Sequence, residues 1–237
     1  MYNEKVNQTL QAKLKTLPRT SGVYFHKSAS GEIIYVGKAA VLKNRVRQYF
    51  QDSRGRDNKT MALVAEIADT DWIETDSEVD ALFLESEMVK RYMPRYNVLL
   101  RDDKSQMYVR IDMKSEWPTV GFTRNPADDG AEYVGPFYNG FALKKALRYL
   151  RRIFPYLTRQ RRPGQSKLDE DLGLSPRLSD GPAAYKVNLR KLISYIKGNR
   201  KAIAAELERD MKTAAGLHDF ERAADLRNKL RAMQELQ

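Results

Sequence analysis

Two short β-rich segments near the N-terminus, separated by a turn sequence, constrain the fold more than any other feature of the chain. Residues 22–26 and 32–36 are rich in aromatic and β-branched side chains, and the five residues 27–31 between them end in glycine. This pattern is typical of a β-hairpin. Alternate side chains of a strand share a face, so the hairpin can bring Tyr24 and Tyr35 together. Ordinary packing of aromatic residues in a sheet explains the same spacing equally well.

The rest of the chain predicts a mixture of helices and strands. Apolar periodicity predicts helices over Glu4–Thr16, 39–50, 78–92, Leu143–Phe154, 184–215 and 219–236. Further strands are predicted over Asp71–Thr75, Tyr108–Asp112 and Thr119–Thr123. Ser77 and Asp80 form a capping-box pattern at the start of the helix over 78–92. A polar segment rich in glycine and proline, residues 166–183, predicts a linker before the helical tail.

Three charged residues that follow the predicted hairpin, Lys38, Arg45 and Glu85, are candidates for a site beside it. Lys38 directly follows the second strand, and Arg45 lies on the next helix, so both side chains can point at one phosphate group. At about 100° per residue, Glu85 lies within about 60° of Leu82 and about 40° of Val89, on the core-facing side of its helix. A carboxylate there needs a partner. A salt bridge to Lys or Arg satisfies this requirement, and so does a divalent cation such as Mg²⁺, which binds through one or two carboxylates plus waters and phosphates.

Positive charge exceeds negative charge and is concentrated in one segment. The chain has 42 Lys and Arg against 31 Asp and Glu, a net charge of +11, and nine of the basic residues lie between Lys144 and Lys167 without an acidic one. This excess favours a nucleic-acid partner, although a basic helix face is also compatible with simple solvation. The predicted DNA contacts are Lys43, Arg47, Lys144, Lys145, Arg148, Arg151, Arg152, Arg159, Arg161 and Arg162.

The chain contains no cysteine and only two histidines, His26 and His218. This excludes disulfides, thiolate zinc sites, iron–sulfur ligation and cysteine nucleophiles, and it argues against a histidine-built metal site. No apolar run approaches the roughly 20 residues that a membrane-spanning helix needs. The N-terminus is polar and acidic, unlike a secretory signal, so we expect a cytoplasmic protein without membrane contact.

Several separate motifs, in order along the chain, resemble the GIY-YIG endonuclease domain. They are Gly22-Val23-Tyr24, Tyr35-Val36-Gly37-Lys38, Arg45, Glu85 and Pro94-Arg95-Tyr96-Asn97. With Gly135-Pro136-Phe137, these motifs are similar to the N-terminal half of the UvrC excinuclease family over residues 18–155. Residues 211–227 resemble the UVR motif through Met211, two Ala-Ala pairs, Phe220-Glu221 and Arg227.

The resemblance implies an α/β (α+β) fold, in which helices flank a small antiparallel GIY-YIG sheet. The implied domains are the endonuclease domain over residues 1–100, an α/β extension with the basic helix over 101–165, a linker over 166–183 and a UVR-like helical hairpin over 184–237.

The resemblance also implies metal-dependent hydrolysis of a DNA phosphodiester near a lesion or distortion, the 3′ incision of nucleotide excision repair. Glu85 would hold one Mg²⁺ or Mn²⁺. Tyr35, or alternatively Tyr24, would orient or deprotonate the attacking water, helped by Lys38. Arg45 would neutralise charge that grows on the phosphate. Tyr49 and Asn97 match supporting positions beside the site.

In the family, the UVR hairpin docks onto a UvrB partner, which here would involve Phe220, Glu221, Ala224 and Arg227. The family also carries a cysteine cluster that binds iron and sulfur, but Arg159, Lys167, Ser175 and Ser179 stand at the corresponding spacing. We therefore expect no iron–sulfur cluster. The chain ends just after the tail, which leaves open a fragment or a naturally short protein. A DNA-binding adaptor that docks onto UvrB without cutting remains the alternative function.

Overall fold

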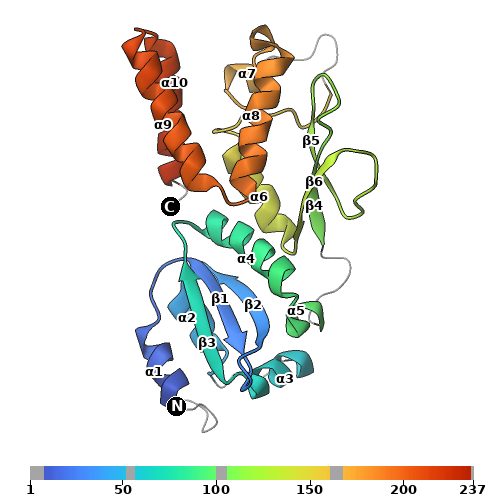
Figure 1. Ribbon diagram of the computed structural model, residues 1–237, viewed down its shortest axis with the longest axis vertical. Coiled ribbons are helices and arrows are strands. Elements are labelled where there is room, and N and C mark those ends of the chain that lie inside the picture. The colour runs from blue at the N-terminus through green and yellow to red at the C-terminus, as the bar shows by residue number, and fades with distance from the viewer. Residues whose placement is uncertain (1–7, 52–56, 100–105, 161–167, 236–237) are drawn as a thin grey trace. The chain divides into compact units, whose positions relative to one another are not determined.

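The computed structural model describes residues 8–51, 57–99, 106–160 and 168–235 of the chain (Figure 1). The chain divides into two compact units, Met1–Asp103 and Lys104–Leu236. Each unit contains one three-stranded antiparallel sheet with helices around it. The predicted mixed α/β fold class with a helical C-terminal region is therefore confirmed.

The sheet of unit 1 consists of β1 (Gly22–Lys27), β2 (Ile33–Ala39) and β3 (Asp69–Glu74) in the order β2-β1-β3. The predicted hairpin is present, because β1 pairs antiparallel with β2. Its register places Tyr24 opposite Gly37 and His26 opposite Tyr35. Opposed residues point to the same face of a sheet, so Tyr24, His26 and Tyr35 share one face.

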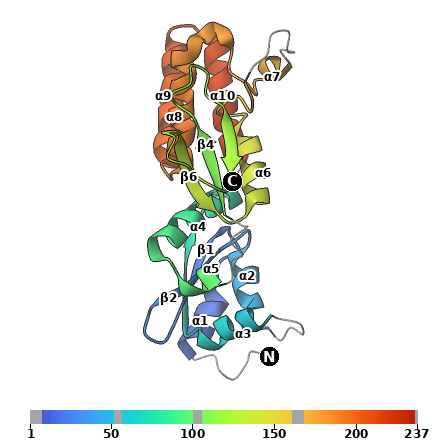
Figure 2. The same ribbon diagram turned by 90° about the vertical axis from the view of Figure 1, so that its right-hand side faces the viewer.

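Helices cover both faces of this sheet (Figure 2). They are α1 (Gln8–Thr16), α2 (Leu42–Gln48), α3 (Asn58–Glu66), α4 (Glu78–Tyr92) and α5 (Arg95–Leu99). Leucines of α1, α2 and α3 form the main core of the unit together with Tyr24. Phe25 points the opposite way and meets Tyr92 of α4, with ring centroids 6.1 Å apart. The sheet is therefore a middle layer, with the tyrosine face toward α1 to α3 and the other face toward α4.

Helix α4 begins and ends with recognisable local signals. The Ser77 hydroxyl accepts a hydrogen bond from the backbone N–H of Asp80 at 2.9 Å, so the N-terminal cap expected from the capping-box pattern is present. The helix ends at Met93, which adopts a left-handed conformation (φ 43°) before Pro94. Leu82 and Val89 are buried against the sheet, and Glu87 is exposed on the other side.

Unit 2 contains a second sheet, in the order β5-β4-β6. The strands of this sheet are β4 (Met107–Ile111), β5 (Val120–Thr123) and β6 (Glu132–Phe137). The helical elements of unit 2 are α6 (Gly140–Leu150), α7 (Leu168–Asp171), the 3₁₀ turn η2 (Leu178–Asp180), α8 (Gly181–Ile196), α9 (Arg200–Gly216) and α10 (Phe220–Glu235). The helix predicted over 184–215 is wrong as a single element. It is divided between α8 and α9 at Gly198, whose φ of 101° favours glycine.

The segment predicted as a linker contains two short helical turns, α7 and η2, and is tied to the rest of unit 2. Arg151 forms an ion pair of 2.9 Å with Asp169, and its Nε donates to the carbonyl of Tyr156. The N–H of Tyr156 donates in turn to the carbonyl of Leu174 at 3.2 Å. These contacts hold the segment that contains Ser175 and Ser179, which stand at the spacing of two of the family's cysteines.

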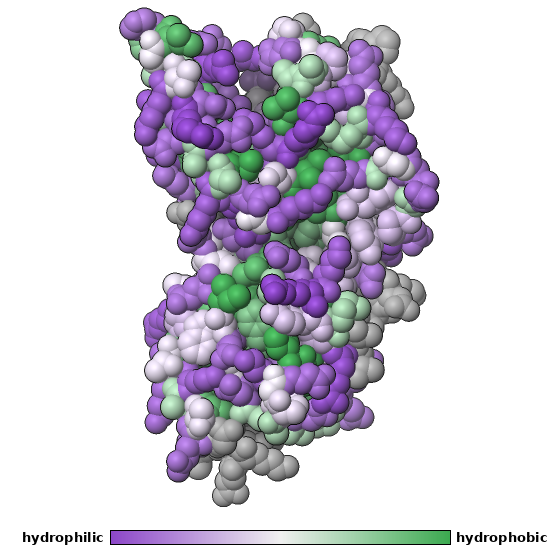
Figure 3. All heavy atoms as spheres, viewed as in Figure 1, coloured by the Kyte–Doolittle hydropathy of each residue, from purple (hydrophilic) through white to green (hydrophobic). Residues whose placement is uncertain are grey.

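Over the described ranges, no helix is long and apolar enough to cross a membrane. On the face shown in Figure 3, hydrophilic residues predominate and hydrophobic ones form small separate patches.

Candidate active site

Three tyrosines from β1, β2 and the end of α2 meet on one face of the sheet in unit 1. The hydroxyls of Tyr24 and Tyr49 are 2.9 Å apart and hydrogen-bonded. The ring of Tyr35 lies 6.1 Å from that of Tyr24 and 6.2 Å from that of Tyr49, between centroids. Tyr24 is 1% exposed, whereas Tyr35 is only partly buried. The phenols predicted from strand alternation are thus brought together.

Gly37 makes room for this arrangement. A Cβ atom at this position would lie 2.5 Å from Cζ of Tyr24. The Tyr24 ring therefore lies directly over the glycine on the neighbouring strand. Only a residue without a side chain permits this contact, which explains the glycine in the second motif.

His26 lies within the same cluster, a placement that the sequence interpretation missed. Its ring is 4.7 Å from that of Tyr49, 5.1 Å from that of Tyr24 and stacked on Tyr35 at 6.1 Å. Nδ1 is hydrogen-bonded to the Thr70 hydroxyl at 2.8 Å, and Nε2 has no hydrogen-bond partner among the residues described. Burial lowers the pKa of His26 to about 3, with a smaller contribution from Arg45. The spacing of two residues from Tyr24 is the sequence signal for this position.

The edge strand β2 is held by side chains of α4 and α5. Glu85 accepts a hydrogen bond from the backbone N–H of Lys38 at 3.0 Å. Asn97 accepts from the N–H of Val36 and donates to its carbonyl, both at 2.7 Å. The two side chains thus pair with backbone groups on the open side of the sheet, as a further strand would. They fix the position of the strand that carries Tyr35.

The two basic residues predicted for the site are in different environments. The Lys38 ammonium pairs with Glu78 at 3.1 Å and is 16% exposed, so its charge is partly neutralised within the protein. Arg45 is exposed, and its guanidinium lies 5.5 Å from the centre of the Tyr49 ring. The Arg45 cation, and not Lys38, therefore acts on the phenols. Glu78, in the first turn of α4, is a partner of Lys38 that the sequence interpretation missed.

The electrostatics of the cluster favour protonated phenols. Burial is the main cause that raises the pKa of Tyr24 well above 10, and burial likewise raises the pKa of Tyr35. Tyr49 and, to a smaller extent, the negative charge of Glu85 add to the rise in pKa at Tyr35, and the Arg45 cation opposes the rise at both residues. The Glu85 carboxylate, which binds the N–H of Lys38 on the strand of Tyr35, is thus close enough to influence that phenol.

The donor set suits a cation that has few protein ligands. In the described ranges, no group of three or more histidines, aspartates or glutamates could hold a metal ion by itself. Glu85 is half-buried, and the hydrogen bond from Lys38 orients its carboxylate. One oriented carboxylate fits Mg²⁺, which keeps several waters and completes its shell with phosphate oxygens.

Most of the predicted DNA contacts are exposed, but two have partners in the fold. Lys144, Lys145 and Arg148 lie on the outer face of α6, and all three are exposed. The helix predicted as far as Phe154 ends at Leu150, so Arg152 and Arg159, also exposed, follow it. Lys43 on α2 is half-buried. Arg47 donates to the carbonyl of Leu14 at 3.0 Å, and Arg151 is engaged with Asp169 and Tyr156 as described above. Arg47 and Arg151 are therefore not among the exposed cations. Arg161 and Arg162 lie outside the described residues.

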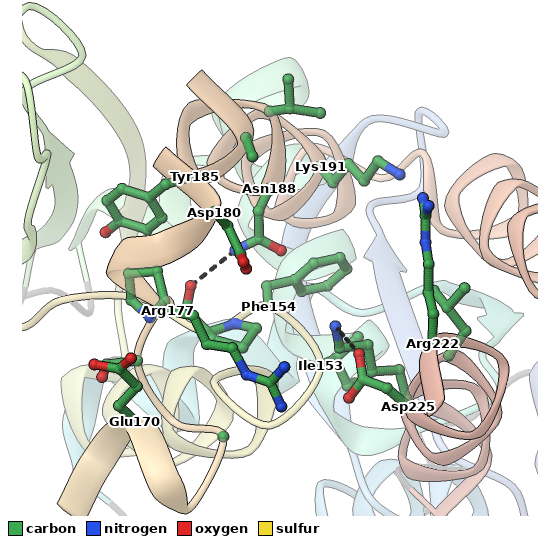
Figure 4. A pocket seen from close by; sticks show the side chains of 18 of the residues that line it. Ile153, Phe154, Glu170, Arg177, Asp180, Tyr185, Asn188, Lys191, Arg222 and Asp225 are labelled. Atoms are coloured by element: carbon green, nitrogen blue, oxygen red, sulfur yellow. Dashed lines mark hydrogen bonds and ion pairs between the residues drawn. The ribbon is translucent and has the colours of Figure 1, made fainter. Parts of the chain in front are cut away.

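The predicted partner residues lie at the tip and along the second helix of the α9–α10 hairpin. Phe220 is 67% exposed, and Leu217 in the adjoining turn is 75% exposed. Glu221 and Arg227 are exposed as well, whereas Ala224 is half-buried. Glu221 lies 3.6 Å from Arg177 across a cleft of about 860 Å³, which Figure 4 shows between the hairpin and the segment around η2. Its lining mixes acidic and basic side chains, and all of it belongs to unit 2.

This geometry defines the class of domain in unit 1. Residues 20–98 match the family model of the UvrC-like GIY-YIG domain and belong to that family. In unit 2, residues 201–236 match the UvrB/uvrC motif.

The relatives of the whole chain are UvrC proteins. UvrABC system protein C of Thermoanaerobacter sp. is 39% identical over 235 residues, which cover 95% of this chain and 38% of that protein. The protein of the same name from Clostridium acetobutylicum is 39% identical over 233 residues, covering 94% and 37%. The chain thus spans less than two fifths of the length of these relatives. A crystal structure of the GIY-YIG N-terminal endonuclease domain of UvrC from Thermotoga maritima, bound to magnesium, is 32% identical, covers 39% of this chain and 99% of its own, and has a TM-score of 0.35.

Proposed function

We propose that unit 1 is a metal-dependent, structure-specific DNA endonuclease that makes the 3′ incision of nucleotide excision repair, near a lesion or distortion. The observation that carries the proposal is the Glu85 carboxylate bound to the N–H of Lys38 on β2, the strand whose Tyr35 meets Tyr24 and Tyr49 beside the Arg45 guanidinium. Membership of residues 20–98 in the UvrC-like GIY-YIG family supports it.

In this proposal, Glu85 holds one Mg²⁺ or Mn²⁺. When bound, the cation polarises the scissile phosphate and stabilises the leaving oxygen. Tyr35 is better placed than Tyr24 to contact the attacking water, because Tyr24 is fully enclosed. With its raised pKa, the Tyr35 phenol is protonated at neutral pH and orients the water through its hydroxyl. Arg45 offers a planar guanidinium to the charge that grows on the phosphoryl oxygens.

Tyr24, Tyr49 and Asn97 act as positioning residues. Tyr24 and Tyr49 hold each other by their hydroxyl contact, and Asn97 clamps the backbone of Val36 next to Tyr35. Lys38 contributes its backbone N–H to Glu85, while its ammonium stays paired with Glu78. We infer that Lys38 orients the metal-binding carboxylate.

The test is cleavage of a pre-nicked or lesion-containing duplex with Mg²⁺ or Mn²⁺, with and without a UvrB-like protein. Glu85→Gln keeps the size of the side chain and an acceptor for Lys38, but removes the charge. We expect cleavage to fall by about a hundredfold or more, because the metal contributes several kcal/mol to the transition state. Glu87→Gln is the matched control, since Glu87 is exposed two residues away on the same helix. Its cleavage should equal that of the wild type.

Equal behaviour of the wild type and Glu85→Gln in every mixture would refute the nuclease proposal. If neither protein cuts DNA but both bind it and the UvrB-like protein, the chain is a non-cutting adaptor.

We further propose that exposed cations contact the DNA backbone and that the UVR motif binds a UvrB-like protein. The net charge of +11 supports the first contact, and the match of residues 201–236 to the UvrB/uvrC motif supports the second.

Phe220→Ala should weaken binding to the UvrB-like protein, because an exposed phenyl ring at the hairpin tip is suited to fill a partner's pocket. Lys212→Ala, an exposed change on α9, is its control. Equal affinities for both variants would refute the role of Phe220.

A further inference from the structure

The outer face of α6 carries exposed aromatic rings among its cations. Phe141 is 81% exposed, the highest value for a large hydrophobic residue in the described part of the chain. Tyr149 on the same helix is 42% exposed, and Phe122 on β5 is 40% exposed. Neither phosphate binding nor packing of the core accounts for rings in these positions.

The rings and the cations form one continuous surface. At about 100° per residue, Phe141 and Arg148 lie within about 20° of each other around the helix axis, and Arg152 follows in the turn after the helix. The opposite face of α6, which includes Leu143 and Leu147, is buried. We define the α6 surface by its exposed members, which are Phe122, Phe141, Lys144, Lys145, Arg148, Tyr149 and Arg152.

The β5 side of this surface contains a direct contact between a cation and a ring. The Lys144 ammonium lies 5.8 Å from the centre of the Phe122 ring. Along the helix, Phe141 and Tyr149 are eight residues apart, or about 12 Å at 1.5 Å per residue. Flat apolar rings thus alternate with positive charges over a length that accommodates a few nucleotides.

We propose that the α6 surface binds single-stranded DNA, with bases stacked on Phe141 and Tyr149 and phosphates at Lys145, Arg148 and Arg152. This inference rests on the proposed function and names the DNA structure that the site takes. The absence of acidic residues from α6 favours a polyanion. The rings add a reason for unpaired bases, because a base in an intact duplex cannot stack on a side chain, whereas an unpaired base can.

The proposal predicts a preference for DNA with unpaired nucleotides, such as a bubble or a gap. Cations alone would bind duplex and single strands through phosphates with little discrimination. Stacking on aromatic rings adds affinity only where bases are exposed, and it does so for every base type.

The test measures binding of the full chain to a fluorescently labelled 12-nucleotide oligo(dT) and to a 12-base-pair duplex, in EDTA so that no cleavage occurs. Phe141→Ala should weaken binding to the single strand by about five- to a hundredfold and change duplex binding less than about twofold. For Phe141→Ala, the slope of the logarithm of the binding constant against the logarithm of the salt concentration should stay the same. Arg148→Gln should instead reduce that slope by about 0.7, the value for one phosphate contact on a single strand.

Leu172→Ala is the control, because it removes a large exposed hydrophobic side chain from a different segment. This control should leave oligo(dT) binding unchanged. Phe141→Trp should retain the binding that Phe141→Ala loses, because it keeps an aromatic ring at this position. A 2-aminopurine base in the oligonucleotide should be quenched by the wild type and not by a Phe141→Ala, Tyr149→Ala double variant. Because Phe141 is exposed, its removal should leave the circular dichroism spectrum unchanged.

Equal affinity of wild type and Phe141→Ala for oligo(dT) would overturn the inference. The inference would also be overturned if Phe141→Ala weakened binding to vesicles of anionic lipid but not to oligo(dT). That result would identify a membrane surface as the ligand. Both outcomes are independent of the nuclease proposal, since the binding assay contains no metal ion and Glu85→Gln leaves the α6 surface intact.

Discussion

The buried histidine in the tyrosine cluster should make unit 1 sensitive to acid. His26 has no exposed surface, and its pKa is lowered from 6.5 to about 3 by burial. Between these two values, the unfolded chain binds a proton at this residue that the folded chain does not. Stability is therefore fully present above about pH 6.5 and decreases as the pH falls toward 3.

The size of the effect follows from the difference in pKa. A shift from 6.5 to about 3, at 1.36 kcal/mol per unit, is worth about 5 kcal/mol in total. Between pH 7 and pH 4, titration of His26 alone should remove about 3 kcal/mol from the free energy of unfolding. This is a large fraction of the 5 to 15 kcal/mol that is typical of a domain.

The assay is urea unfolding of the full chain at pH 7 and pH 4, followed by the fluorescence of Trp72 on β3. Trp117 is changed to Phe in every protein, so that the signal reports unit 1 alone. His26→Met removes the titrating group and retains an apolar side chain of similar size. We expect this variant to lose about 3 kcal/mol less than the parent protein between the two pH values.

Thr70→Val is the control, because it removes the hydrogen bond to His26 and leaves the imidazole in place. It should lower stability at both pH values and keep the same pH dependence. Acidic groups such as Asp71, whose pKa is lowered by hydrogen bonds from Lys13 and Lys27, titrate equally in all the proteins. If His26→Met and its parent lose the same free energy between pH 7 and pH 4, the imidazole is not buried in its neutral form and the reasoning is wrong.

Three further substitutions test the packing around the sites. Gly37→Ala should displace the Tyr24 ring, lowering the free energy of unfolding by about 1 to 3 kcal/mol in urea titrations and reducing cleavage with it; unchanged values would contradict the close contact. Tyr185→Phe should lower stability by about 1 to 3 kcal/mol in thermal unfolding, because its hydroxyl bridges a buried N–H and a buried carbonyl. Asn97→Leu should leave both backbone groups of Val36 unpaired and reduce kcat for cleavage more than DNA affinity; a change in affinity alone would argue against a positioning role.

The sequence predicted the parts of unit 1 that depend on local signals. Strand alternation and the glycine turn predicted that Tyr24 and Tyr35 share a face, and Ser77 marked the start of α4. These signals lie within a few residues of the structure that they specify. Tyrosines on adjacent strands can therefore be inferred before any tertiary contact is known.

Other elements escaped prediction because their local sequence opposes or obscures them. Strand β6 contains Gly135 and Pro136, which are unfavourable inside strands and are tolerated here because β6 lies at the edge of its sheet. The break between α8 and α9 rests on a single glycine within a long stretch that otherwise favours helix. Tertiary pairing decides the first case and backbone conformation the second.

Long-range partners were beyond the reach of spacing arguments. Lys38 and Glu78 are 40 residues apart, and Asn97 and Val36 are 61 residues apart. No periodicity within one element encodes such a pair. This is why Lys38 was expected to assist a phenol, whereas the structure pairs its ammonium with Glu78.

The same contacts that protect the edge of the sheet also orient the proposed metal ligand. An edge strand presents unpaired backbone groups, and on β2 these groups are taken by Glu85 and Asn97. Glu85 thus makes a structural hydrogen bond through one oxygen, in addition to its proposed role as a metal ligand. Glu85→Gln retains a carbonyl oxygen for Lys38 and removes only the charge, whereas Glu85→Ala removes both. A difference in stability between the two variants therefore measures the edge contact, and their shared loss of cleavage would measure the metal site.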